Sequence, residues 1–240
     1  MNYIDILEIR GMKSLRITLA FVFICCIAQF ASAQDWANLE RFRQANSELS
    51  MPKSNEHRVV FMGNSITEAW IKMRPEFFED KPYVNRGISG QTTPQMLLRF
   101  KQDVIDLDAS VVVILAGIND IAGNTGPSTI KMITDNIFSM AELAKANGIE
   151  VIICSVLPAA DFPWRPGMQP APKVIELNGH LKAYAQENDL VYVDYFSAMV
   201  DKDNGLKQEL GTDGVHPNAA GYLTMEPLLE KGISKALKRD

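Results

Sequence analysis

The segment Ser110–Ala116, with the sequence SVVVILA, constrains the fold more than any other part of the chain. It contains an unbroken run of Val, Ile and Leu residues, with no alternation of apolar and polar positions. Such a run is typical of a central strand in a parallel sheet that helices cover on both faces. Polarity then appears abruptly at Gly117–Asp120, so we expect the strand to end there.

Apolar segments of strand length alternate along the chain with segments of helical periodicity. Strands are expected within residues 58–63, 82–86, 110–116, 149–155 and 190–194. Helices are expected within residues 35–49, 65–75, 94–107, 128–146, 174–187 and 219–237. Strands that alternate with helices pair in parallel through right-handed crossovers. The sequence therefore predicts an α/β protein, a three-layer α/β/α sandwich with a five-stranded parallel sheet of the flavodoxin-like type.

The N-terminal segment has the three parts of a secretory signal peptide. Two basic residues precede the mainly apolar run Ile17–Phe30, which leads to an A-x-A cleavage site at Ala31–Ala33. We predict that residues 1–33 are a signal peptide, and Met12 is an alternative natural start because acidic residues precede it. The run is shorter than the roughly 20 residues of a membrane-spanning helix. We therefore expect an exported protein, periplasmic or extracellular, without a stable membrane span after cleavage.

Cleavage would leave a chain of about 207 residues, an ordinary length for one domain. Residues 34–240 are therefore expected to form a single domain. Cys154 would be the one cysteine left in it, so no internal disulfide is expected. The net charge would be near −6, and a mildly acidic surface argues against nucleic acid as a partner.

The turn after the first predicted strand contains a serine at position 65. The segment Arg58–Trp70, RVVFMGNSITEAW, predicts a buried strand, a tight turn and a helix. A Ser65 hydroxyl at this turn would be exposed to substrate, and its N–H would lie near a helix N-terminus, where negative charge is favoured. Two alternatives stay open. Asn64 or Ser65 could be the N-cap of the helix, and the loop could bind a nucleotide phosphate, although the Walker and GxGxxG patterns are absent.

Other polar turns should lie beside this serine. Glycine-containing turns follow three further predicted strands, at residues 87–94, 117–120 and 211–218. The carboxyl ends of parallel strands share one edge of the sheet, where open α/β sheets bind ligands. Gly90 would let the backbone approach a ligand closely. Asn119 can donate from an uncharged amide, and its alternative role is an Asx-turn or helix cap.

The last of these turns contains a histidine three residues after an aspartate. Asp213 can accept from Nδ1–H of His216, which leaves Nε2 free to take a proton from Ser65. A D-x-x-H pattern alone is more often a surface turn. The other histidines, His57 and His180, have no comparable carboxylate, and the three show no zinc-site spacing. We therefore predict no metal.

Four short blocks contain these candidate residues: FMGNS at 61–65, NRGISGQTT at 85–93, GIND at 117–120 and DGVHP at 213–217. Together and in this order they resemble the SGNH hydrolases, the GDSL esterase/lipase superfamily, and are most similar to its platelet-activating-factor acetylhydrolase-like branch. The resemblance spans nearly all of the chain after the signal peptide. One residue departs from the pattern, because Asn64 stands where the family usually has the aspartate of G-D-S.

The resemblance implies a serine hydrolase site that needs no cofactor. It implies Ser65 as the nucleophile, His216 as the base and Asp213 as the residue that orients the base. It also implies three oxyanion donors, which are the Ser65 N–H, the Gly90 N–H and the side-chain amide of Asn119. The aspartate replaced by Asn64 is not a triad member in the family pattern, so we expect activity to survive.

The predicted function is that of an exported serine esterase acting on a small-molecule ester. The branch resemblance suggests a short acyl group, acetyl first, on a carbohydrate or another small alcohol. Alternatives are a lysophospholipase or longer-chain lipase of the same family, a non-catalytic glycan-binding module, and a flavodoxin-like binder of phosphate or flavin. The presence of Ser65, Asp213 and His216 argues against the non-catalytic module.

A proline-rich segment, Leu157–Pro172, is expected to be a long loop at the rim of the substrate pocket. Its side chains could stack on a sugar or donate hydrogen bonds to it, and the loop could equally be a lid packed on the domain. The candidates for substrate contact are Asn64, Phe162, Trp164 and Arg165.

Overall fold

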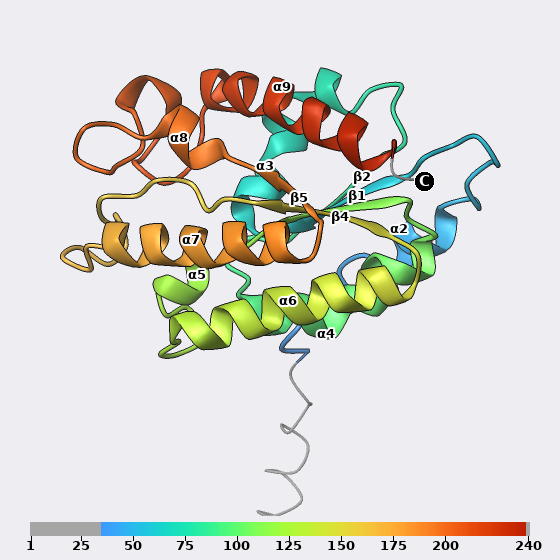
Figure 1. Ribbon diagram of the computed structural model, residues 1–240, viewed down its shortest axis with the longest axis horizontal. Coiled ribbons are helices and arrows are strands. Elements are labelled where there is room, and N and C mark those ends of the chain that lie inside the picture. The colour runs from blue at the N-terminus through green and yellow to red at the C-terminus, as the bar shows by residue number, and fades with distance from the viewer. Residues whose placement is uncertain (1–34, 239–240) are drawn as a thin grey trace, which may run out of the picture. The chain divides into compact units, whose positions relative to one another are not determined.

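The strand predicted from the longest apolar run is present as β3 (Val111–Leu115), and all of its residues are buried. The computed structural model of the protein describes residues 35–238. In this range β3 belongs to a parallel five-stranded sheet with the order β2-β1-β3-β4-β5 (Figure 1). The other strands are β1 (Val59–Gly63), β2 (Tyr83–Gly87), β4 (Glu150–Cys154) and β5 (Val191–Val193). The predicted α/β class and the five-stranded parallel sheet are confirmed.

Helices cover both faces of this sheet (Figure 1). One layer contains α3 (Ser65–Met73), α8 (Tyr195–Met199) and α9 (Ala219–Ala236). The other contains α4 (Thr93–Asp103), α5 (Ile118–Ile121), α6 (Ile130–Ala146) and α7 (Ala171–Glu187). Single turns of 3-10 helix lie at Pro75–Phe77, Ile105–Leu107 and Gln208–Leu210. Both faces of the sheet are thus shielded from water, as the uninterrupted apolar strands require.

Three neighbouring strands, β2, β1 and β3, end at the same level. Gly63, the last residue of β1, pairs with Gly87 of β2 on one side and with Leu115 of β3 on the other. The turns that follow these three strands therefore leave the sheet side by side. This register brings the segments that contain Ser65, Gly90 and Asn119 to one edge.

Aromatic side chains fill the space between the sheet and the layer of α3 and α9. The Trp70 ring stacks on Phe77 at a centroid distance of 5.1 Å and lies 5.2 Å from the ring of Tyr222. The hydroxyl of Tyr222 donates a hydrogen bond to the carbonyl of Ile66 at 2.7 Å. The last helix, α9, is thereby tied to the first turn of α3.

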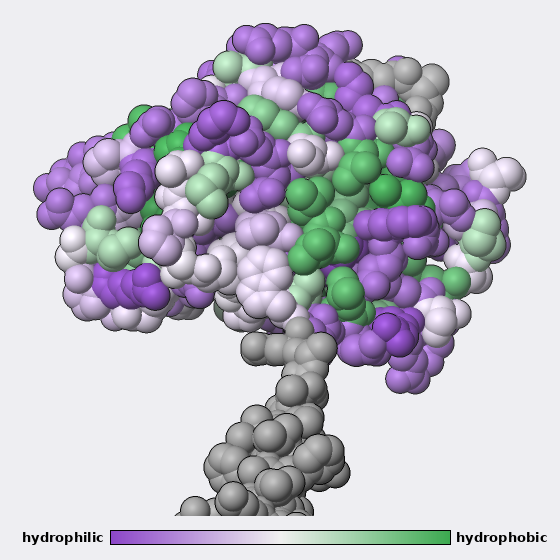
Figure 2. Space-filling view, turned by 90° about the horizontal axis from the view of Figure 1, so that it is seen from below, coloured by the Kyte–Doolittle hydropathy of each residue, from purple (hydrophilic) through white to green (hydrophobic). Residues whose placement is uncertain are grey.

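The helical layer that contains α4 and α6 has a mixed surface. Figure 2 shows the molecule from below, where hydrophilic residues surround a group of hydrophobic ones. The exposed apolar side chains of α4 and α6 include Leu98, Met132 and Leu143. Polar residues cover most of this face, as expected for the outer side of a helical layer.

The first helix of the described range is shorter than the sequence predicts. An amphipathic helix is expected over residues 35–49, whereas the structure has only α2 (Arg43–Glu48), which buries none of its residues. This segment is held by polar contacts instead, because Asn46 donates from its amide to the Asp103 carboxylate at 2.7 Å. The prediction of a helix packed through an apolar stripe is therefore wrong here.

The targeting predictions concern a different part of the chain. The predicted signal peptide, residues 1–33, lies outside the described residues and stays a prediction. Residues 37–238 form one compact unit. Among the helices of residues 35–238, none combines the length and the apolar character needed to cross a membrane.

Candidate active site

Ser65 is the first residue of α3 and directly follows the cap of that helix. Asn64 is the N-cap, and its Oδ1 accepts a hydrogen bond from the Ile66 N–H at 3.0 Å. Of the two capping alternatives, the structure selects Asn64. Its side chain is 1% exposed, so the position predicted for substrate contact is a buried capping position. The N–H of Ser65 belongs to the first turn, where no acceptor exists within the helix.

The serine hydroxyl lies within hydrogen-bond distance of a histidine that is 151 residues away in the sequence. The distance between Ser65 Oγ and His216 Nε2 is 2.9 Å, and Nδ1 of the same ring lies 2.8 Å from Oδ2 of Asp213. An ionised carboxylate can only accept hydrogen bonds. Nδ1 therefore holds the ring proton, and the lone pair of Nε2 faces the hydroxyl. The structure thus brings together the three side chains expected to form a triad.

Asp213 is fixed by the backbone of its own loop. Its Oδ1 accepts hydrogen bonds from the N–H groups of Val215 at 3.0 Å and His216 at 2.8 Å. Burial acts to raise the pKa of the Asp213 carboxyl, but hydrogen bonds from the backbone and ring of His216 outweigh it and lower the pKa below its ordinary value. The carboxyl is therefore ionised at neutral pH and favours the ring tautomer in which Nε2 can accept from the Ser65 hydroxyl.

The two other predicted oxyanion donors lie at the same edge. Gly90 has a φ of +79°, a conformation that favours glycine, and no atom lies within 4 Å of the place where a Cβ would be. Its carbonyl accepts from the Asn124 side chain at 3.2 Å. The buried amide of Asn119 donates one N–H to the carbonyl of Gln91 at 3.0 Å. A primary amide has two N–H groups, so a second one is available for a ligand oxygen.

These groups surround a cavity of about 260 Å³. Its lining residues are Ser65, Ser89, Gly90, Asn119, Asn124, Trp164 and His216. Sequence reasoning missed Ser89 and Asn124, although Ser89 is the neighbour of Gly90 and belongs to one of the four blocks. None of these lining residues has an aliphatic side chain, and hydroxyl, amide and imidazole groups line the cavity together with the indole of Trp164.

The proline-rich loop reaches this cavity through one residue. Trp164 is 42% exposed, and its ring centroid lies 6.0 Å from that of His216. Phe162 is 1% exposed and stacks on Trp164 at 5.1 Å. Arg165 donates to the carbonyl of Ala122 at 2.6 Å. Of the three loop residues predicted to contact substrate, the structure places Trp164 at the cavity, while Phe162 and Arg165 anchor the loop.

A buried carboxyl group follows Asn119. Asp120 is 3% exposed, and burial raises its pKa to about 6, although hydrogen bonds from the hydroxyl and N–H of Thr93 oppose the shift. This group links the turn after β3 to the amino end of α4. Within residues 35–238, no group of three His, Cys, Asp or Glu side chains is placed to hold a metal ion.

A parallel α/β sandwich with a hydrogen-bonded Ser, His and Asp at the carboxyl edge of its sheet has the architecture of an ester hydrolase. The comparison with protein families agrees with this class. Residues 61–223 match the model of the GDSL-like lipase/acylhydrolase family, and this chain belongs to that family. The matched range begins in β1 and ends in α9, so it contains all four sequence blocks.

Solved structures support the same assignment. A candidate acylhydrolase from Bacteroides fragilis is 51% identical, with a TM-score of 0.83 over 85% of this chain and 99% of that chain. A GDSL-like lipase from Bacteroides thetaiotaomicron is 50% identical, with a TM-score of 0.81 over 83% and 98%. An acetylxylan esterase from Geobacillus stearothermophilus shares the fold at 19% identity, with a TM-score of 0.58 over 77% and 96%. No curated protein matches the chain.

Proposed function

We propose that the protein is an exported serine esterase that removes short acyl groups, acetyl first, from a carbohydrate or another small alcohol. The observation that supports this most directly is the 2.9 Å distance between Ser65 Oγ and His216 Nε2. A non-catalytic glycan-binding module would have no need for a hydroxyl paired with an imidazole that a carboxylate orients. The family membership gives the reaction class, and the geometry of the site supports the proposed mechanism.

In the proposed mechanism, Ser65 Oγ bonds to the ester carbonyl carbon while His216 Nε2 takes the hydroxyl proton. The carbonyl oxygen becomes an oxyanion and accepts from the Ser65 N–H, the Gly90 N–H and the Asn119 amide. The intermediate then collapses, the bond to the alcohol oxygen breaks, and the alcohol leaves with the proton from His216. Water repeats these steps on the acyl-enzyme, which releases the acid and restores Ser65.

The preference for a short acyl group is supported by the size and lining of the cavity. A volume of about 260 Å³ with hydroxyl, amide and imidazole groups in its wall suits an acetyl group. A long acyl chain would instead need an apolar channel in which to bury its methylene groups, each favoured by about 0.8 kcal/mol when buried. The lysophospholipase or longer-chain lipase alternative is therefore the weaker one.

A carbohydrate is proposed as the alcohol because an exposed indole, Trp164, forms one side of the cavity. Aromatic faces are suited to stack on the apolar face of a sugar ring. The fold is shared with an acetylxylan esterase, so acetylated xylo-oligosaccharides are the first carbohydrate esters to test.

The decisive experiment compares the wild type with Ser65→Ala on aryl esters of acetate, butyrate and octanoate. Loss of a triad nucleophile should lower kcat by on the order of 10⁴-fold or more. Ser197→Ala is a matched control, because the Ser197 hydroxyl bonds to Asp194 and does not line the cavity. A Ser65→Ala variant that keeps most of the rate would exclude the mechanism, and a higher kcat/KM for octanoate than for acetate would exclude the acetyl preference.

Export has a separate test. N-terminal sequencing of the protein isolated from its source cell should find Gln34 as the first residue. A mature protein that retains residues 1–33 would contradict the proposed cleavage without affecting the proposed chemistry.

A further inference from the structure

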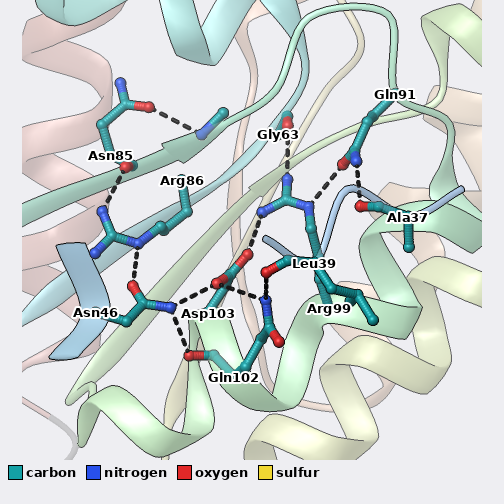
Figure 3. A network of polar contacts seen from close by, with 11 residues as sticks. Ala37, Leu39, Asn46, Gly63, Asn85, Arg86, Gln91, Arg99, Gln102 and Asp103 are labelled. Carbon is teal, nitrogen blue, oxygen red and sulfur yellow. Dashed lines mark hydrogen bonds and ion pairs between the residues drawn. The ribbon is translucent and has the colours of Figure 1, made fainter. Parts of the chain in front are cut away.

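Arg99, in α4, is a charged residue with no exposed surface, and it is not among the residues that line the cavity. Its guanidinium is the centre of a polar network (Figure 3). Nη1 donates to Asp103 Oδ2 at 3.0 Å, Nη2 to the Gly63 carbonyl at 3.2 Å, and Nε to Gln91 Oε1 at 2.6 Å. One side chain therefore contacts the end of β1, the turn after β2 and its own helix.

Two of these three partners, Gly63 and Gln91, lie within two residues of a proposed oxyanion donor. Gly63 is two residues before Ser65, and Gln91 directly follows Gly90. The main-chain carbonyl of Gln91 accepts the hydrogen bond from the Asn119 amide. The three donors come from turns after three different strands, and Arg99 is linked to all three turns, to the third through Gln91.

The Gln91 side chain has a fixed orientation as well. While its Oε1 accepts from Arg99, its Nε2 donates to the carbonyl of Ala37 at 2.7 Å. Rotating the amide by half a turn would place a donor against Arg99 and an acceptor against Ala37, so both bonds would be lost. The position of the Gly90–Gln91 peptide is thus determined from the interior of the protein.

We propose that Arg99, acting through Gly63 and Gln91, is a positioning residue that sets the spacing of the three oxyanion donors. This inference rests on the proposed function, because it assigns a role to Arg99 in the same site. Arg99 does not touch the substrate. By bonding to both Gly63 and Gln91, it fixes the distance between the turn that contains Ser65 and the turn that contains Gly90, where the oxyanion would form.

The salt bridge between Arg99 and Asp103 does not by itself explain why Arg99 also bonds to Gly63 and Gln91. Arg99 and Asp103 are one helical turn apart, and burying both charges is unfavourable unless further hydrogen bonds satisfy them. Asp103 obtains such a bond from Asn46, whereas Arg99 obtains its further bonds from the two turns of the site. A planar guanidinium can direct several N–H groups at fixed angles, which the single ammonium of lysine cannot do.

The test compares Arg99→Lys with Arg58→Lys. Arg58 is a matched control, since it is 4% exposed and donates to two main-chain carbonyls, those of Leu107 and Ser50, at 2.6 and 2.7 Å. It precedes β1, whereas Arg99 contacts the last residue of the same strand. Both variants keep the charge and lose a buried guanidinium, so a merely structural role predicts the same effects for both.

The quantities to measure for the wild type and both variants are kcat and KM on an aryl acetate. The affinity for a boronic acid that forms a tetrahedral adduct with Ser65 should be measured as well. Arg99→Lys should lower kcat by about 10- to 100-fold, because small displacements of catalytic groups have effects of this size. KM should change by less than about threefold, and boronic acid affinity should fall in parallel with kcat, since both depend on oxyanion stabilisation. Arg58→Lys should lower the unfolding temperature and leave kcat and boronic acid affinity unchanged.

Gln91→Met provides a second variant should Arg99→Lys fail to fold. It removes the amide oxygen that accepts from Arg99 Nε, while Arg99 stays paired with Asp103, and it should also lower kcat. Values of kcat and boronic acid affinity in both site variants that equal those of Arg58→Lys would overturn the proposal.

Failure of the proposed function would look different. In that case the wild type itself would show no esterase activity that depends on Ser65. Crystal structures of the wild type and Arg99→Lys would then decide the positioning role on geometry alone. Displacement of Gly90 N or Asn119 Nδ2 by more than about 0.5 Å, the tolerance of a preorganised site, would support it, and superposition within that limit would overturn it.

Discussion

The carboxylate of Asp120 accepts two hydrogen bonds from Thr93, one from its hydroxyl at 2.6 Å and one from its N–H at 3.0 Å. Thr93 is the first residue of α4, so a negative charge lies at the positive end of that helix. The same contact joins the turn that contains Asn119 to the helix that contains Arg99. A group buried this deeply should affect stability in a pH-dependent way.

We expect the unfolding free energy of the wild type, relative to Asp120→Asn, to fall as the pH rises from 4 to 6. The pKa of Asp120 is about 6 in the folded protein. In the unfolded chain its carboxyl is exposed and has the ordinary pKa of 3.8. The folded state therefore binds this proton more tightly than the unfolded chain, and ionisation destabilises it. The change should be on the order of 3 kcal/mol and complete somewhat above pH 6. Urea unfolding of both proteins at several pH values measures it, and parallel curves would contradict it.

Asp213→Asn should lower kcat by roughly 10⁴-fold, as the equivalent change does in serine proteases. An amide can still accept from the backbone N–H groups through its oxygen, so the loop should keep its shape. Its NH₂ group would then face His216 Nδ1 and favour the tautomer in which Nε2 holds the proton and cannot take one from Ser65. Steady-state kinetics and the unfolding temperature should show a large loss of rate with little loss of stability. A rate within tenfold of the wild type would remove Asp213 from the mechanism.

Trp164→Ala should raise KM for an acetylated xylo-oligosaccharide by roughly fivefold, since an aromatic stacking contact contributes about 1 kcal/mol. The acyl group is held elsewhere, so kcat should change little, and an aryl acetate should be less affected than the sugar ester. Met168→Ala is the control, because Met168 is 40% exposed on the same loop but does not line the Ser65 cavity. Equal KM values for the two variants would exclude Trp164 from substrate binding.

Gly87→Ala should destabilise the protein by about 1–3 kcal/mol, as overpacking does. An added Cβ would lie 2.2 Å from the backbone nitrogen of Glu68, so β2 and α3 would have to separate. Gly179→Ala in α7 is the control, because no atom lies within 4 Å of its Cβ position. That change should stabilise the protein by about 0.5–1 kcal/mol, since alanine favours a helix interior more than glycine. Chemical unfolding of both variants measures the difference, and equal effects would contradict this account.

The arrangement of the sheet was predictable because its strands have unusually clear sequences. The run that became β3 is apolar without interruption, and β1, β2 and β3 each lead into a turn that contains a glycine or polar residues. Parallel pairing then requires the turns to share one edge, which is how Ser65, Gly90 and His216 could be placed together without coordinates. The sequence could not predict the register of β1 with β2 and β3, which determines how closely the turns after these strands approach one another.

The buried polar network could not be predicted in this way. Arg99 occupies a helix position where a charged residue is normally exposed, and its burial depends on acceptors that are 36 and 8 residues away in the sequence. The same reason explains the short α2, because Asn46 is held by Asp103 of a distant helix rather than by an apolar stripe. Asn64 was ambiguous between capping and substrate contact, and only its hydrogen bond to Ile66 decides between them.

The bond from Tyr222 to Ile66 also bears on when the enzyme can begin to work. The helix that begins with Ser65, the proposed nucleophile, is tied to α9, and His216, the proposed base, precedes α9 by only a few residues. A ribosome therefore releases both after the entire sheet has been made. A chain whose synthesis has stopped before residue 216 would hold Ser65 with no imidazole beside it, so under the proposed mechanism only the completed chain can hydrolyse an ester.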